Sequence, residues 1–144
     1  MAETLGSLCD KLTIVKLKQF HTDDEVRKQS LILQENNLKQ EMDDFLEGAF
    51  SGTIPADKLS FSANKVYKKQ GNEISDIKGS LGEVFSKLAE VNCLLWHEQE
   101  KVYEFELVPV EEKDKVVKQL AILNLQRNKC IDEIDNNIKV LIGS

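Results

Sequence analysis

The sequence is poor in residues that break helices and in residues that form covalent cross-links. Its 144 residues include two prolines, seven glycines and three cysteines. So few helix breakers exclude a chain made mostly of loops and favour long regular elements. The cysteines are odd in number and widely spaced, which is not the pattern of a disulfide framework. We therefore expect a reducing compartment, the cytoplasm.

Long apolar runs and blocks of positive charge are also missing. No apolar stretch approaches the roughly 18 residues that cross a bilayer, and the start does not resemble a secretory signal. Acidic residues outnumber basic ones by 25 to 19, and the net charge is -6. Such a charge repels phosphate backbones and anionic lipid surfaces. We expect neither a nucleic acid nor a membrane as partner.

The residues that are present have the composition of a globular helical protein. Hydrophobic residues make up 41% of the chain and charged residues 31%, which is too apolar for a disordered segment. A chain of this length buries roughly two thirds of its unfolded surface around one core. We expect residues 1–144 to form a single domain.

Apolar residues recur at steps of three and four along most of the chain, and this spacing predicts an all-α fold. The first helix is expected to begin at Leu5. A capping box at Thr22–Glu25 is predicted to start the second helix, which should end near Phe50. Residues 51–80 are expected to form a loop with some helical content.

The second half of the chain has the more regular pattern. The longest helix is predicted to run from Ile74 to Val102, Pro109 marks a turn, and the last helix should end at Gly143. About four main helices joined by short turns predict an antiparallel up-and-down bundle.

Two polar residues fall on the apolar face of the last helix. Asn124 and Arg127 lie between Leu120 and Ile131, and both are expected to face the core. A guanidinium removed from water needs a carboxylate partner. Glu98, which interrupts the apolar repeat of the long helix, is the first candidate, and Asp10 in the first helix is the second. Such a pair fixes helix register or belongs to a ligand or catalytic site.

A second polar line follows the long helix through Asn92, Trp96, Gln99 and Tyr103. Trp96 is the only tryptophan of the chain. A large aromatic with one polar atom usually anchors a core edge or an interface, and a stacking platform for a base or sugar ring is the alternative.

The known catalytic and metal-binding motifs are absent. Cys93 and His97 stand four residues apart and could share an ion with His21 and Cys130, but no zinc or metalloprotease motif surrounds them. The carboxylates between Glu98 and Glu106 and at Asp132, Glu133 and Asp135 are interpreted as a solvated acidic face. We expect no metal, no cofactor and no catalytic residue.

Three blocks of sequence carry a resemblance to a known family. They are Leu5–Ile14 (LGSLCDKLTI), Val91–Trp96 (VNCLLW) and Asn124–Arg127 (NLQR). In order and spacing they resemble the G-E-L-x-D-K-[IL]-[ST]-I-L, V-N-x-x-L-W and N-x-x-R motifs of small uncharacterised bacterial proteins, a domain of unknown function. Ser7 replaces the usual glutamate of that family, and Gln99 replaces one member of an acidic pair.

The resemblance implies a context and no activity. Family members look associated with surface-polysaccharide or glycosyl-transfer systems. Six residues lie in the motifs and also on the helix faces discussed above, and we expect them to converge into one polar cluster. With Glu98 added they are the candidate ligand-binding residues: Asp10, Lys11, Asn92, Trp96, Glu98, Asn124 and Arg127.

Two functions from different classes remain open. The first, which the sequence favours, is a non-catalytic interaction or accessory protein. It is expected to form a homodimer or bind a protein partner, with exposed apolar positions that meet another helix: Phe61, Phe85 and Phe105. The second is a binding module or enzyme for a phosphorylated or sugar ligand. There Lys11 and Arg127 would hold an anion and Asp10 or Glu98 would act as acid or base.

Overall fold

The computed structural model describes residues 3–61 and 77–143, and all of its regular elements in these ranges are helical. The α-helices are α1 (Leu5–His21), α2 (Glu25–Ser51), α3 (Leu81–Tyr103) and α4 (Val110–Gly143). Short 3₁₀ helices follow α2 at Ala56–Lys58 and α3 at Phe105–Leu107. The predicted all-α bundle is confirmed, with α4 rather than α3 as the longest of these helices.

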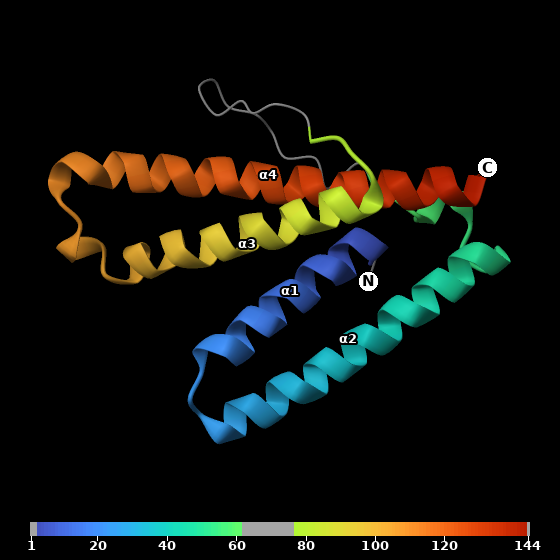
Figure 1. Ribbon diagram of the computed structural model, residues 1–144, viewed down its shortest axis with the longest axis horizontal. Coiled ribbons are helices and arrows are strands. Elements are labelled where there is room, and N and C mark those ends of the chain that lie inside the picture. Colours follow the sequence, from blue (N-terminus) through green and yellow to red (C-terminus); the bar gives the residue numbers. More distant parts are fainter. Residues whose placement is uncertain (1–2, 62–76, 144) are drawn as a thin grey trace.

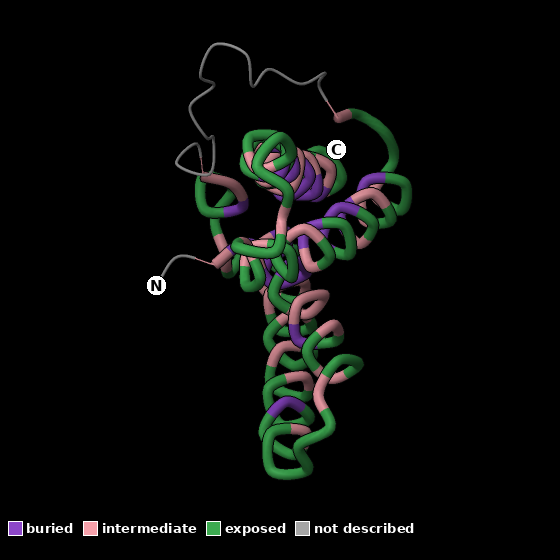
Figure 2. The backbone as a smooth tube through the Cα atoms, turned by 90° about the vertical axis from the view of Figure 1, so that its left-hand side faces the viewer, coloured by how far each residue is buried: buried purple, intermediate pink, exposed green. Residues whose placement is uncertain are grey.

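The bundle is made of two antiparallel hairpins. Helices α3 and α4 lie side by side, and α1 and α2 form the second pair (Figure 1). Helix α1 also contacts α3 and α4, whereas α2 packs mainly on α1. The α1/α2 hairpin is therefore attached to the α3/α4 pair mainly through α1. Its end at the α1–α2 connection is mostly exposed (Figure 2).

The core lies where the first half of α1 meets α3 and α4. One cluster joins Leu5 and Cys9 of α1 to Leu88 of α3 and Ile134 of α4. A smaller cluster joins α3 to α4 nearer their connection. Full burial of one aliphatic side chain contributes about 1.5 to 3 kcal/mol, so the larger cluster is a main source of apolar stabilisation. No helix in the described part of the chain is long and apolar enough to span a membrane.

Helix α2 begins two residues later than the predicted capping box requires. The Thr22 amide still donates to the Lys18 carbonyl, so Thr22 closes α1. The Asp24 carboxylate then accepts from the amides of Val26 and Arg27 and caps α2. The box at Thr22 was therefore wrong because that residue belongs to the end of the preceding helix. Helix α2 ends at Ser51, close to the predicted Phe50.

Helix α3 also begins later than predicted. Residues 77–80 are not helical, and the Ser80 hydroxyl and Glu83 carboxylate form a capping box at its start. Ile77 fits the apolar repeat and packs against the core from the preceding segment. The predicted start at Ile74, and much of the expected helical content between 51 and 80, lie outside the described residues.

The aromatic residues expected to be exposed are half-buried instead. Phe85 packs against the larger core cluster, and Phe105 lies beneath the ammonium of Lys113, 4.9 Å from the ring centre. Phe61 is also only partly exposed. The expectation that these three side chains are exposed was therefore wrong.

Candidate functional site

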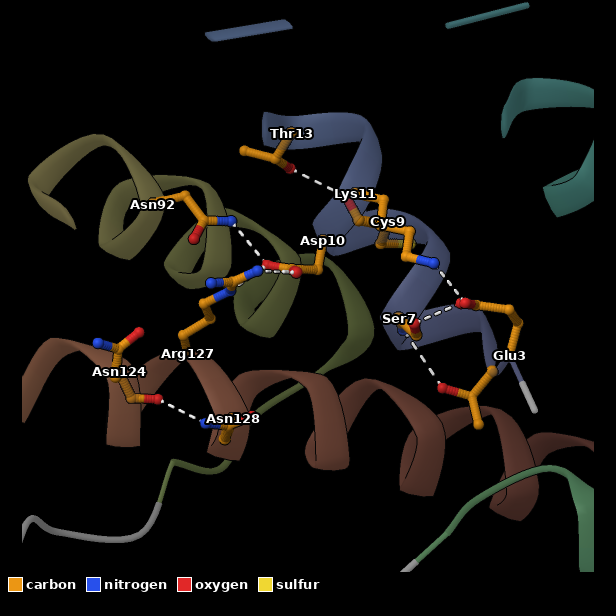
Figure 3. A network of polar contacts seen from close by, with 11 residues as sticks. Glu3, Ser7, Cys9, Asp10, Lys11, Thr13, Asn92, Asn124, Arg127 and Asn128 are labelled. Atoms are coloured by element: carbon orange, nitrogen blue, oxygen red, sulfur yellow. Dashed lines mark hydrogen bonds and ion pairs between the residues drawn. The ribbon is translucent and has the colours of Figure 1, made fainter. Parts of the chain in front are cut away.

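Three of the six residues expected to form a polar cluster meet between α1, α3 and α4 (Figure 3). Arg127 of α4 donates through Nε to Asp10 Oδ1 at 2.8 Å and through Nη2 to Asp10 Oδ2 at 2.5 Å. Asn92 of α3 donates through Nδ2 to Asp10 Oδ1 at 3.0 Å. A single carboxylate of α1 therefore joins three helices.

The burial of the three residues differs. Asp10 and Asn92 are buried, whereas the Arg127 side chain keeps 34% of its surface exposed. Hydrogen bonding to Asp10 raises the pKa of Arg127, although burial opposes this. Arg127 thus remains a cation whose charge the Asp10 carboxylate balances. This geometry favours a structural ion pair, because the carboxylate already accepts three hydrogen bonds.

Glu98, the first predicted partner of Arg127, lies elsewhere. Its carboxylate accepts from Lys101 on the same helix at 3.1 Å. In an antiparallel pair, residues equally distant from the connection face each other, and Arg127 is much farther from the α3–α4 connection than Glu98. The offset is about twelve residues, or roughly 18 Å along the helix. The second candidate, Asp10, is the partner because α1 crosses at the level of Arg127.

The remaining candidates do not join this cluster. Lys11 pairs with Glu3 at the start of the chain. Asn124 is exposed, which contradicts its predicted core position, because the contacts of α1 with α4 lie farther along the helix, at Arg127 and Asp135. Trp96 stacks on His21 at the end of α1, with ring centres 4.8 Å apart and an angle of 14° between the planes.

The sequence interpretation missed a second buried carboxylate. Asp135 was assigned to a solvated acidic face, but it is buried and accepts from the Gly6 amide at 2.8 Å. Burial raises the pKa of Asp135 to about 6, while the Thr4 side chain and the Gly6 amide favour the charged form. The signal that could have found it is Gly6 in the first turn of a helix, where glycine is a poor choice unless another backbone comes close.

The backbone does come close at Gly6. A Cβ atom there would lie 2.4 Å from the Ile131 carbonyl oxygen and 2.9 Å from Asp135 Oδ1. Only glycine allows α1 to approach α4 at this distance. Gly6 and Asp135 therefore fix how the first hairpin meets the second.

In the described part of the chain the cysteines and histidines do not gather into a metal-binding group. Cys9 and Cys130 are buried, and burial raises the pKa of these thiols to about 12 and about 11, so both stay protonated and unreactive. Cys93 is exposed. Within residues 3–61 and 77–143 no three histidine, cysteine or acidic side chains come close enough to share a metal ion.

A shallow groove of about 430 Å³ passes over the exposed side of Arg127. Lys11 and Lys18 also line it, together with the carboxylate of Glu41. Arg127 and Lys11 are already paired with Asp10 and Glu3. The groove therefore offers little uncompensated positive charge to an anion.

Comparison with protein-family models, with curated proteins and with solved structures finds no match to this chain.

Proposed function

We propose that this protein is a non-catalytic accessory protein that works by helix–helix association, and that its first partner is a second copy of itself. The observation that carries the proposal is the outer face of α2. We define this face by five exposed residues that follow alternating steps of three and four: Val26, Gln29, Leu33, Asn36 and Gln40.

The spacing of this face is that of a coiled-coil seam. Val26, Leu33 and Gln40 are seven residues apart, and Gln29 and Asn36 fill the intermediate positions. Val26 and Leu33 expose 81% and 62% of their surface, and α2 packs mainly on α1, through its opposite side. Apolar residues at this spacing on a helix bury themselves against another helix.

The charge pattern of α2 supports the same conclusion. The five residues of the outer face are uncharged, in a chain of which 31% is charged. Depletion of charge is the compositional mark of an interface core, whereas an ordinary solvated face carries lysine and glutamate. The polar Gln29 and Asn36 would set the register of the two helices.

The polar cluster supports a structural rather than a catalytic role. Its carboxylate accepts three hydrogen bonds from Arg127 and Asn92, which disfavours acid–base chemistry and a ligand site centred on Arg127. The free thiols of Cys9 and Cys130 support the expectation of a reducing, cytoplasmic setting, and the bacterial setting comes from the family resemblance alone. The family resemblance adds glycosyl-transfer systems as the context in which such an accessory protein would act.

Sedimentation equilibrium over a wide range of concentrations tests the proposal. We expect the average mass to rise from the 16.4 kDa of one chain toward twice that value. Leu33→Lys should weaken the dimer at least tenfold, since it places like charges across the seam. Val140→Lys, at another exposed apolar residue on α4, is the matched control. A constant monomer mass, or equal effects of the two variants, would refute the proposal.

A further inference from the structure

A second groove lies between the end of α1, the start of α2 and the middle of α3. Helices α1 and α3 diverge toward their C-terminal ends (Figure 1), and there the Trp96 ring of α3 stacks on the His21 ring of α1. The groove has a volume of about 550 Å³, and we call it the Trp96 groove. Its chemically active lining consists of Lys18, His21, Arg27, Ser30, Gln34 and Trp96.

The two cations of this groove differ from the neighbouring ones. Lys11, Lys16 and Lys28 each have a carboxylate within salt-bridge distance. In the described part of the chain the side chains of Lys18 and Arg27 have none. No acidic side chain from the described ranges lines the Trp96 groove. A local excess of positive charge therefore persists in a protein whose net charge is -6.

The groove also has a flat aromatic wall. The His21 and Trp96 rings are nearly parallel, and Phe20 meets His21 edge-on with ring centres 5.3 Å apart. Trp96 is half-buried, so its position is fixed while part of its ring stays accessible. A rigid indole is a good surface on which a planar ring can stack, at little cost in conformational entropy.

From this combination we infer that the Trp96 groove binds a nucleoside phosphate. Lys18 and Arg27 supply charge-assisted hydrogen bonds to the phosphate, and a guanidinium fits phosphate oxygens in a bidentate geometry. The Ser30 hydroxyl and the Gln34 amide offer partners for the ribose, and Trp96 offers a face for the base. The volume of the groove lies within the range of small-ligand sites.

This site differs from the one that the sequence suggested. The sequence suggested that Lys11 and Arg127 would bind an anion, but carboxylates already balance the charges of both side chains. Lys18 lines both grooves, and only in the Trp96 groove is it joined by a second uncompensated cation. The negative overall charge keeps long nucleic acids away and leaves room for a single nucleotide.

The only tryptophan of the chain lies in the groove, so its emission reports binding directly. The full-length protein is titrated with ADP and UDP, with adenosine and uridine, and with inorganic pyrophosphate, and each titration is repeated by calorimetry. We expect saturable binding of ADP or UDP, at least tenfold weaker binding of the matching nucleoside, and weakening by added salt. Absence of binding by both methods, or pyrophosphate binding as tight as that of ADP, would overturn the assignment.

Variants separate this groove from the rest of the surface. Lys18→Ala and Arg27→Ala should each weaken ADP or UDP binding at least fivefold. Both residues are exposed, so the fold should persist, and thermal unfolding checks this. Lys115→Ala, at an exposed lysine of α4, is the control and should leave the affinity unchanged. If all three variants bind as the native chain does, the groove is not the site.

Discussion

At Asp10, one carboxylate satisfies donors from two other helices. Asp10→Ala leaves the Arg127 guanidinium half-buried without its partner and the buried Asn92 amide without its acceptor. Breaking a fully buried pair costs about 3 to 5 kcal/mol. Because Arg127 keeps 34% of its side chain exposed, we expect a smaller loss, about 2 to 3 kcal/mol. Urea unfolding of the purified variant measures it.

Glu98→Ala provides the control for this measurement. Glu98 pairs with Lys101 at the surface of one helix, and such pairs contribute at most about 1 kcal/mol. We expect Glu98→Ala to be the milder variant by a clear margin. Equal losses in the two variants would mean that the Asp10 contacts add no more than a surface pair does.

The buried carboxylate of Asp135 makes the stability depend on pH. Burial raises its pKa from the ordinary 3.8 to about 6 in the folded protein. Folding therefore favours the protonated carboxyl group. The contribution of this group to stability is fully present below the pKa of the unfolded chain. It is lost as the pH rises through the pKa of the folded protein. A shift of this size corresponds to a loss on the order of 2 to 3 kcal/mol.

Comparison with Asp135→Asn isolates this contribution. An asparagine side-chain oxygen can still accept from the Gly6 amide, and it carries no charge at any pH. We expect the unfolding free energy of the native chain, minus that of the variant, to fall as pH rises from about 4 to about 6. A difference that stays constant over this interval would contradict the burial of an ionisable group here.

At the scale of the helix, the start of α2 depends on one side chain. Asp24 accepts from the amides of Val26 and Arg27, and replacing such a cap with alanine costs typically about 1 kcal/mol. Thr22 accepts only the Asp24 amide, at 3.3 Å outside the helix. Thermal unfolding should therefore show a larger loss for Asp24→Ala than for Thr22→Ala. The reverse order would restore the capping box that the sequence suggested.

The positions of the helices follow from local sequence, and their ends follow less well. Apolar periodicity located the four α-helices of the described residues, since a buried face imposes the same spacing wherever it packs. It could not place the start of α3, because Ile77 contacts the core from a non-helical segment. Periodicity records which side chains are buried, and burial does not require that the backbone be helical.

The partner of Arg127 shows what local sequence cannot supply. The need for a carboxylate follows from the position of Arg127 on an apolar face, and it was confirmed. Choosing Asp10 over Glu98 depends on where α1 crosses the other hairpin, and that crossing is set by contacts more than a hundred residues apart in the chain. The two cations of the Trp96 groove escaped notice for the same reason, since groove and aromatic wall exist only once three helices are assembled.

For the whole molecule, the close approach at Gly6 adds to the Asp10 contacts and the core in fixing how the two hairpins meet. Gly6 brings α1 so near to α4 that an added Cβ would lie 2.4 Å from the Ile131 carbonyl oxygen. Gly6→Ala must therefore push the hairpins apart, strain the bond between the Gly6 amide and Asp135, and loosen the core around Leu5. Overpacking of this kind costs about 1 to 3 kcal/mol.

Gly82→Ala is the matched control, because nothing lies within 4 Å of the Cβ that it adds to α3. Alanine is the better helix former by up to about 1 kcal/mol, so this variant should gain stability while Gly6→Ala loses it.

Wider separation of α1 from α4 in Gly6→Ala also lets water reach Asp135, whose pKa should then fall back toward its ordinary value. Gly6→Ala should consequently flatten the pH dependence that Asp135 gives the native chain, whereas Gly82→Ala should preserve it. Urea unfolding of both variants at pH 4 and pH 7 measures both effects. If the unfolding free energies of the two glycine variants change equally between pH 4 and pH 7, the approach at Gly6 does not hold the hairpins together.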